Sequence, residues 1–322
     1  MSIERSAEAG YADAHAPVLS VRGLSKRFGH KIAISGFDLD VEAGEVVGFV
    51  GPNGAGKTTT LRILAGLLKA DAGEGQVLGC NILTAHDLVG RRVGYMPQKL
   101  ALYGELSVVE NLRFRAEVYE LDDPKDAVEQ AIAGFGLEPF RRQKASSLSG
   151  GWARRLQLAA ALIHKPRLIL LDEPTAGLDA ESKQDVWRRV IALAQGGASV
   201  VINTHDLAEA EQCRRVALFS AGRVLALGEP HQITEAAPFR AALITGAGVQ
   251  LLATRFESIA GVAATLPQGA KLRVLFALKA LAAIRETARL AGVAVEEAPK
   301  RLEDAAFVLV RDAALITPEG RA

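Results

Sequence analysis

The chain has 322 residues, with 38 Lys and Arg against 37 Asp and Glu, so its formal net charge is +1 with His neutral. This balance argues against a nucleic-acid partner, which needs a basic excess on one face, and the 49% of hydrophobic residues excludes intrinsic disorder. The two cysteines, Cys80 and Cys213, lie far apart, which argues against a disulfide scaffold or a Cys-ligated zinc site and suits a reducing compartment.

Residues 1–17 are predicted to be a flexible N-terminus that ends at Pro17. The segment contains acidic residues and has no apolar stretch of the kind found in signal peptides. No uncharged apolar run in the chain approaches the ~18–20 residues that a membrane-spanning helix needs. We therefore expect a chain that does not span a membrane itself.

The first elements are predicted to be strands, because apolar and polar residues alternate over 18–21, 33–34 and 37–41. Three short, almost continuous apolar runs follow at 45–50, 168–171 and 199–202, which is typical of strands buried on both faces of a parallel sheet. Helical segments lie between these runs, and a first one is predicted over 58–68. The pattern indicates an α/β fold with a mostly parallel sheet.

The stretch 100–165 is predicted to be nearly all helical, with a capping-box spacing at Ser107 and Glu110 and helical periodicity over 152–164. A hairpin is expected at 216–227, turning at Ala221-Gly222, and a domain boundary at 228–230.

The C-terminal stretch, 231–322, is predicted to be a small α+β domain. Strands are expected at 249–253, 272–276 and 293–295, and helices at 280–291 and 302–310.

A glycine-rich loop after the 45–50 strand fits the pattern GxxxxGK[ST]. In such a loop consecutive backbone N–H groups point at phosphate oxygens, the lysine reaches the β- and γ-phosphates, and the hydroxyl after it binds Mg²⁺. The strand before the loop and the helix after it are the context that the motif requires. The expected nucleotide-binding residues here are Gly51, Pro52, Asn53, Gly54, Ala55, Gly56, Lys57, Thr58 and Thr59.

Two carboxylates end the apolar strand at 168–171. Asp172 is predicted to hold Mg²⁺, and Glu173 to polarise the attacking water as a general base. Two acidic residues after a strand are by themselves more often a solvated loop. Together with the upstream phosphate loop they predict a nucleotide hydrolase with ATP and Mg²⁺ as its ligands.

Further motifs follow in order along the chain: Gln98 in Tyr95-Met96-Pro97-Gln98, then Leu148-Ser149-Gly150-Gly151, Asp179 in Ala176-Gly177-Leu178-Asp179, and His205 in Asn203-Thr204-His205. With this set the chain resembles ATP-binding cassette (ABC) proteins over most of 18–230. The resemblance implies a P-loop cassette with a mostly parallel sheet, an antiparallel β subdomain and a helical subdomain at about 100–165. It also implies the function of an ATPase.

The resemblance gives roles to these residues. Ser149, Gly150 and Gly151 are expected to bind the γ-phosphate of ATP held by a second subunit in a head-to-tail dimer, most simply a homodimer. Gln98 is expected to sense Mg²⁺ and water, and His205 to contact the γ-phosphate and orient the water. As an isolated residue, His205 would instead be an ordinary surface or core histidine.

Three more positions follow from the family pattern. Asp179 is expected at the dimer interface, although a turn aspartate has an equally simple structural explanation. Phe28 stands where the family places an aromatic ring that stacks on adenine, with an exposed-turn or core phenylalanine as the alternative. Trp152 departs from the glutamine that usually follows the signature, and is expected to pack within the helical subdomain or at the dimer face.

The segment Leu302-Glu303-Asp304-Ala305-Ala306-Phe307 looks like the one that closes many efflux-type subunits, and its alternative is an ordinary amphipathic helix. The resemblance therefore implies a peripheral subunit at the cytoplasmic face of the inner membrane, powering export through a separate type-2 permease. An importer subunit and a soluble ABC ATPase acting on ribosomes or DNA are the alternatives. The transported compound is not encoded in this chain.

Overall fold

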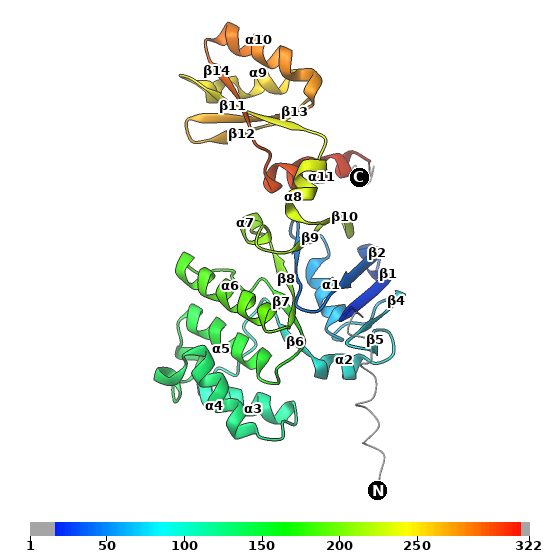
Figure 1. The fold of residues 1–322 in the computed structure, drawn as a ribbon, viewed down its shortest axis with the longest axis vertical. Helices are drawn as coiled ribbons and strands as arrows, with labels where there is room; N and C mark the ends of the chain where they lie inside the picture. The colour runs from blue at the N-terminus through cyan, green and yellow to red at the C-terminus, as the bar shows by residue number, and fades with distance from the viewer. Residues whose placement is uncertain (1–16, 317–322) are drawn as a thin grey trace. The chain divides into compact units, whose positions relative to one another are not determined.

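The computed structural model describes residues 17–316, so the N-terminus expected to be flexible lies, apart from Pro17, outside the described residues. Contacts divide the chain into two units, Met1–Val224 and Leu225–Ala322. This division falls a few residues before position 230, where the sequence places the boundary. The two units are described separately (Figure 1).

The first unit is organised around a six-stranded sheet in the order β10-β9-β3-β8-β7-β6, of which β10 begins in this unit and continues past Val224. The pairs β3/β8, β3/β9, β7/β8 and β6/β7 are all parallel, which confirms the predicted α/β fold. The strands are β3 (Val46–Val50), β6 (Val93–Met96), β7 (Leu168–Asp172), β8 (Ser199–Thr204), β9 (Arg215–Ser220) and β10 (Arg223–Gly228). Ala221 and Gly222, both with positive φ, form the predicted two-residue turn between β9 and β10.

A second sheet in this unit is antiparallel and has the order β2-β1-β4-β5. Its strands are β1 (Leu19–Phe28), β2 (Lys31–Val41), β4 (Ala72–Val77) and β5 (Cys80–Asn81). Leu19 of β1 lies opposite Val41 on one side and Val77 on the other, so β1 is paired along both edges. The two short runs predicted at 33–34 and 37–41 are one continuous strand.

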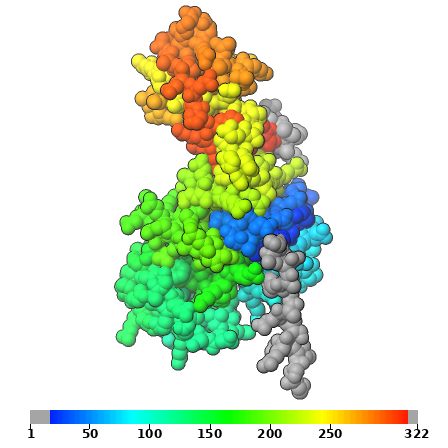
Figure 2. All heavy atoms as spheres, in the orientation of Figure 1, coloured from blue at the N-terminus to red at the C-terminus, as the bar shows by residue number. Residues whose placement is uncertain are grey.

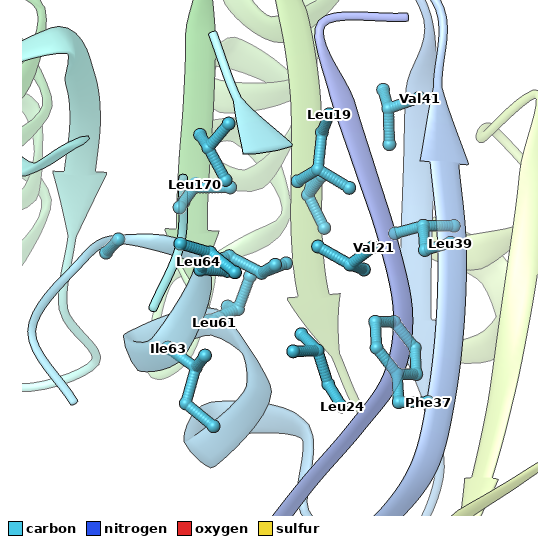
Figure 3. Packing of buried hydrophobic residues seen from close by; sticks show 14 of the residues in the cluster. Leu19, Val21, Leu24, Phe37, Leu39, Val41, Leu61, Ile63, Leu64 and Leu170 are labelled. Carbon is cyan, nitrogen blue, oxygen red and sulfur yellow. The ribbon is translucent and has the colours of Figure 1, made fainter. Parts of the chain in front are cut away.

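The main hydrophobic core lies where the inner face of the antiparallel sheet meets the central sheet and α1 (Lys57–Leu64) (Figure 3). Alternate residues of β1, such as Leu19 and Val21, pack with Leu61 and Leu64 of α1 and with Leu170 of β7. Helix α1 ends before the predicted position 68 because Gly66 adopts a left-handed conformation, with φ +70°.

Three phenylalanine rings join the strands beneath the glycine-rich loop. Phe37 and Phe49 meet edge to face with centroids 5.7 Å apart, and Phe219 lies 5.6 Å from Phe37 and 5.0 Å from Phe49. Such pairs add roughly 0.5–1.5 kcal/mol beyond the burial of their area. The cluster fixes β2, β3 and β9 with respect to one another where the loop begins.

All secondary structure elements at 100–165 are helical, and a single isolated bridge joins Ser107 to Lys144. Ser107 and Glu110 form the predicted capping box at the start of α3. The teal and green atoms of this region form a continuous part of the surface in Figure 2.

The helices of this region are α3 (Val108–Val118), α4 (Pro124–Phe135), η1 (Glu138–Phe140), η2 (Ala145–Ser147) and α5 (Gly150–Leu162). The unit also contains α2 (His86–Arg92), α6 (Ala180–Gln195) and α7 (Leu207–Ala210).

The C-terminal unit contains a four-stranded antiparallel sheet in the order β12-β13-β11-β14. Helices follow the first and third strands, so the chain reads βαββαβ with the strand order of a ferredoxin-like motif. The helix α8 (Pro230–Ala236) precedes the motif and α11 (Leu302–Ile316) follows it. The other elements are β11 (Arg240–Thr245), η3 (Val249–Leu252), α9 (Ala253–Glu257), β12 (Val262–Gln268), β13 (Lys271–Phe276), η4 (Leu278–Ala280), α10 (Leu281–Ala291) and β14 (Ala294–Ala298).

The prediction of a strand at 249–253 is wrong, because this segment forms η3 and enters α9. Gly248, with φ +68°, turns the chain into the helix. Val249 is buried whereas Leu251 is 89% exposed, so the apolar run does not face a sheet. The strands β11 and β12 were not predicted, because their many alanines carry little strand preference.

Helix α11 is anchored to the sheet by a buried ion pair. Arg273 of β13 is 1% exposed and donates from Nε to Asp304 Oδ1 at 2.9 Å, while its Nη2 donates to Asp304 Oδ2 and to the carbonyl of Pro299. Asp304 also accepts the backbone N–H of Arg301 at 3.0 Å. Asp304 therefore has two roles: it accepts a backbone N–H just before the first turn of α11, and it joins the helix to β13.

Removing one charge of this pair is expected to unfold the C-terminal unit locally. Arg273→Met leaves Asp304 buried without its partner, which costs about 3–5 kcal/mol, whereas the double variant Arg273→Met/Asp304→Leu removes both charges and loses much less. Hydrogen exchange of peptides from 240–312 measures the effect. Arg289→Ala, which breaks an exposed pair with Glu286, is the control and should shift exchange by no more than about 1 kcal/mol.

The ends of α3 and α5 are joined by a stacked pair of rings. Tyr119 and His164 have centroids 3.7 Å apart and an interplanar angle of 16°. Burial lowers the pKa of His164 to about 4. The imidazole is therefore neutral in the folded chain at neutral pH, and protonating it requires charging a largely buried ring.

This burial predicts an acid-sensitive contribution to stability. The unfolded chain binds a proton near pH 6.5 and the folded one only near pH 4, so stability falls as pH drops between these values. His164→Phe, which keeps a ring against Tyr119, should show a shallower decrease of the thermal midpoint from pH 7 to pH 4.5. An unchanged pH dependence in this variant would contradict the role given to His164.

Candidate functional site

The site forms where the parallel strands of the central sheet end. Val50 of β3 lies opposite Thr204 of β8, and Asp172 of β7 lies opposite Asn203. Met96, the last residue of β6, lies opposite Leu171. Because parallel strands present their carboxyl ends at one edge of the sheet, the segments that follow them meet there.

The glycine-rich loop needs its glycines for two reasons. Gly51, Gly54 and Gly56 have φ of +147°, +79° and +104°, a region that L side chains rarely adopt. A Cβ atom would also collide with the carbonyl of Phe219 at Gly51 and with that of Ala33 at Gly56. The loop thus curls tightly against the sheet, and α1 begins directly after it at Lys57.

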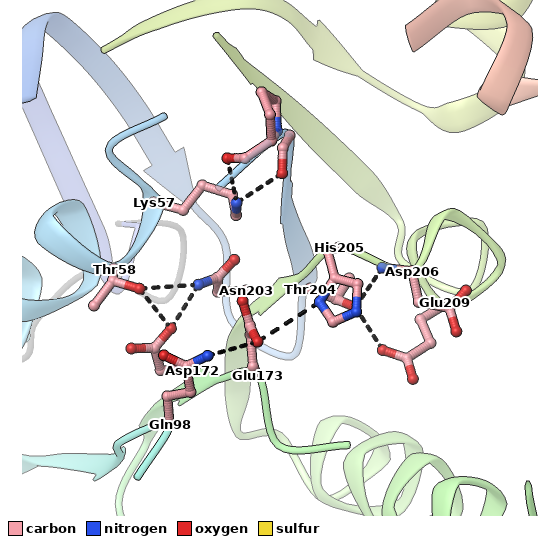
Figure 4. Close-up of polar contacts among 12 residues, drawn as sticks. Lys57, Thr58, Gln98, Asp172, Glu173, Asn203, Thr204, His205, Asp206 and Glu209 are labelled. Carbon is pink, nitrogen blue, oxygen red and sulfur yellow. Dashed lines mark hydrogen bonds and ion pairs between the residues drawn. The ribbon is translucent and has the colours of Figure 1, made fainter. Parts of the chain in front are cut away.

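Lys57 folds back over this loop (Figure 4). Its Nζ donates to the carbonyls of Gly51 at 2.7 Å and Pro52 at 3.0 Å. Burial lowers the pKa of the amine, and the charges of Glu173 and Asp172 oppose this. A cationic amine and a helix N-terminus beside a curled loop form an arrangement suited to binding phosphate.

A hollow of about 500 Å³ opens beside the loop. The structure places most of the predicted nucleotide-binding and catalytic residues around it. Phe28 is 51% exposed at the end of β1, and the ammonium of Lys26 lies over its ring, 5.6 Å from the centroid. The hollow is lined by Phe28, Lys31, Ala33, Asn53, Gly54, Gly56, Lys57, Thr58, Thr59, Gln98 and Glu173.

Thr58 and Asp172, the two residues predicted from their motifs to bind metal, lie together with Asn203 in the hydrogen-bonded triangle of Figure 4. Thr58 Oγ1 donates to Asp172 Oδ1 at 3.0 Å, and Asn203 Nδ2 donates to the same oxygen at 2.5 Å. Burial raises the pKa of Asp172, while the bonds from Asn203 and Thr58 act in the opposite direction.

The residues present fit a magnesium ion. Asp172 Oδ2 is buried and has no hydrogen-bond partner among the described residues, and Oδ1 of the same carboxylate accepts the hydroxyl of Thr58. A carboxylate and a hydroxyl are hard oxygen ligands, which Mg²⁺ prefers. Gln98, also expected near the metal, instead donates to Glu173 in this structure.

Glu173 lies near the other two residues predicted to be catalytic and is hydrogen-bonded to one of them. Its Oε2 accepts a hydrogen bond from Gln98 Nε2 at 2.8 Å and lies 3.6 Å from His205 Nδ1. The backbone of Glu173 has φ +49°, and its N–H donates to the carbonyl of Asn203 at 2.9 Å. Non-glycine residues in this conformation cost about 1–3 kcal/mol and are concentrated at functional sites.

The signature residues are not part of this hollow. Ser149, Gly150, Gly151 and Asp179 line a second hollow of about 510 Å³ in the same unit. Ser149 precedes α5 without a side-chain capping bond, so its hydroxyl is not committed to the helix. Asp179, in contrast, caps α6 by accepting from the N–H and hydroxyl of Ser182, at 2.9 and 2.8 Å.

Trp152 contacts residues of the helical region, one of the two places predicted for it, and it also lines the second hollow. Its ring lies 4.4 Å from Phe140, and the guanidinium of Arg155 lies 4.2 Å from its centroid. Sequence reasoning did not select Lys31 and Ala33 in the lining of the hollow, and it also did not select Asn203. Its only signal in the sequence is a polar side chain at the end of an otherwise apolar strand.

Comparison with known proteins gives the family. A family model described as "ABC transporter" matches residues 34–176. The "Nod factor export ATP-binding protein I" of Cupriavidus metallidurans is 37% identical over 221 residues, which are 68% of this chain and 73% of that protein. The chain belongs to the ABC transporter family. The resemblance inferred from its motifs is therefore confirmed.

Other relatives have the same kind of name. The "Probable multidrug ABC transporter ATP-binding protein YbhF" of Escherichia coli is 37% identical over 89% of this chain. The chain spans only about half the length of that relative, 51%. The "Daunorubicin/doxorubicin resistance ATP-binding protein DrrA" of Streptomyces peucetius is 40% identical over 65% of this chain and 64% of that protein.

Solved structures of ABC cassettes share the fold. The dimeric cassette MJ0796 bound to ADP and Pi has 25% sequence identity and a TM-score of 0.62, covering 66% of this chain and 98% of that one. An ATP-binding subunit of an ABC transporter has 29% identity and a TM-score of 0.62, with 67% and 92% covered. The P-loop cassette fold predicted from the sequence is thereby confirmed.

Proposed function

We propose that the chain is an ATP-binding and hydrolysing subunit that powers export of a small molecule through a separate membrane permease. The observation that carries this proposal is the position of Glu173. Its carboxylate is held by Gln98 and near His205, and it borders the same hollow as Lys57 and Thr58. A base, a metal-ligand pair and a phosphate loop in one place are the parts that hydrolysis of a nucleoside triphosphate requires.

ATP is the proposed substrate. The curled loop and the N-terminus of α1 would bind its phosphates, and Lys57 would exchange its bonds to the loop carbonyls for bonds to phosphate oxygens. The exposed ring of Phe28 at the rim of the hollow would stack on the adenine. When bound, Mg²⁺ would neutralise charge on the β- and γ-phosphates, held by Thr58 and Asp172.

Glu173 would take the proton of the attacking water. Gln98 and His205, both within reach of its carboxylate, would orient that carboxylate and the water. The strained backbone at Glu173 fixes where its side chain leaves the strand. Each of the three residues comes from the end of a different strand, so the geometry depends on the parallel sheet.

The second hollow supports a head-to-tail dimer. Ser149, Gly150 and Gly151 line a separate cavity from the phosphate loop, so one chain presents the two halves of a site in two different places. A second cassette could bring its own signature residues to the ATP bound by the first. MJ0796 is a relative in fold whose dimer has been determined with ADP and Pi.

Export rather than import is favoured by the names of the relatives, which include multidrug, Nod factor export and daunorubicin resistance proteins. Along residues 17–316 no helix is long and apolar enough to cross a membrane. A partner chain with membrane-spanning segments would supply the channel, and this subunit would lie at the cytoplasmic face of the membrane.

Glu173→Gln is expected to lower the turnover of ATP by about 10²–10⁴-fold, because the amide cannot accept the proton of water. ATP binding should remain, since the loop and the metal ligands are unchanged. Steady-state phosphate release and equilibrium binding of a fluorescent ATP analogue measure the two effects. Glu129→Gln, at an exposed ion pair with Arg141, is the matched control. Near-normal turnover in Glu173→Gln would refute the proposed base.

The tagged chain, purified from native membranes in mild detergent, should retain a membrane-embedded partner in a fixed ratio, identified by mass spectrometry. Inside-out vesicles containing both chains should accumulate substrate when ATP is added outside. ATP-driven loss of substrate from such vesicles would indicate an importer. Fractionation of the chain with ribosomes or DNA instead of membranes would indicate a soluble ABC ATPase.

A further inference from the structure

Asn203 lies between the two residues proposed to hold the metal. It is 1% exposed, near the end of β8, and its Nδ2 donates to Asp172 Oδ1 at 2.5 Å and to Thr58 Oγ1 at 3.3 Å. The two oxygens are themselves 3.0 Å apart, so the amide nitrogen donates to both from one side. Its side chain thus connects β8 to β7 and α1 at the point where the metal ligands meet (Figure 4).

These bonds make the two oxygens of the Asp172 carboxylate different. Oδ1 accepts from both Thr58 and Asn203, whereas Oδ2 is buried and has no partner among the described residues. A carboxylate held at one oxygen by two donors cannot rotate without breaking both bonds. The oxygen that stays free is therefore determined by Thr58 and Asn203 together.

The amide is oriented by the same contacts. Turning it over would place Asn203 Oδ1 against the carboxylate oxygen, where two acceptors repel. In the orientation observed, Asn203 Oδ1 is buried and unpaired among the described residues. A buried acceptor without a partner costs about 1–3 kcal/mol, so packing alone does not favour asparagine here.

We propose that Asn203 is a positioning residue that fixes the orientation of the Asp172 carboxylate beside Thr58, so that the carboxylate is ready to bind the cation. This inference rests on the proposed function, because the cation enters with the nucleotide. Asn203 does not touch the metal or the phosphates; it acts through Asp172 and Thr58.

The expected effect is on metal affinity more than on nucleotide affinity. Removing a hydrogen-bond partner of a metal ligand typically weakens metal binding by about 10–100-fold. Asn203→Val fits a buried strand but donates no hydrogen bond. Asn203→Ser keeps one donor, placed one bond closer to the backbone, and should recover part of the affinity.

The experiment uses the full chain with a non-hydrolysable ATP analogue and Mn²⁺ as the probe. Electron paramagnetic resonance of free Mn²⁺ gives the metal dissociation constant, and a fluorescent form of the analogue in EDTA gives the metal-free nucleotide affinity. Ser199→Ala is the control. Ser199 is also buried on β8, but its hydroxyl binds the carbonyl of Glu42 at the other end of the strand.

We expect Asn203→Val to weaken Mn²⁺ binding at least about tenfold. The Mn²⁺ affinity of Asn203→Ser should lie between those of Asn203→Val and the native chain, and Ser199→Ala should leave the Mn²⁺ affinity unchanged. Metal-free nucleotide affinity should stay within about twofold in all of them. Unchanged Mn²⁺ affinity in Asn203→Val, or an equal loss with and without metal, overturns the role of Asn203. If the native chain binds neither the nucleotide nor Mn²⁺, the proposed function itself fails.

Discussion

The parallel pairing of β3, β7 and β8 is the constraint on which the candidate site depends. Its register places Val50 beside Thr204 and Asp172 beside Asn203, so the loop, the carboxylates and the histidine leave the sheet at one edge. These strands are buried on both faces, and a slip of one residue would turn their apolar side chains and Asp172 to the opposite faces. The chemistry of the site is thus fixed by packing well below it, including the three phenylalanine rings beneath the loop.

Much of the first unit could be predicted from its sequence because its signals are local. The phosphate loop, the capping box at Ser107 and the strand that ends at Asp172 are each encoded by one continuous stretch of sequence. The motifs also occur along the chain in the order that the family shows. Asn203 could not be predicted in this way, since its partners Thr58 and Asp172 are 145 and 31 positions away in the sequence. Only the folded sheet brings them together.

The C-terminal unit was predicted less accurately, and the reasons are physical. A short, mostly apolar segment such as 249–253 suits a strand or a helix equally well, and the left-handed turn at Gly248 decides between them. The alanine-rich strands β11 and β12 are stabilised by pairing with β13, not by their own preference. The segment beginning at Leu302 has a recognisable pattern, but the bond between its Asp304 and Arg273 joins residues 31 positions apart and so has no local signal.

That ion pair has a consequence for how the C-terminal unit can evolve. Replacing one member of the pair leaves the other charge buried without a partner and destabilises the unit. Replacing both members removes both charges and lowers the stability much less. A single substitution at Arg273 or Asp304 therefore gives a less stable protein. Replacing the pair by two apolar residues requires both substitutions together. Related chains are expected to keep both residues or to lack both, with few intermediates, so that the two positions co-vary across the family.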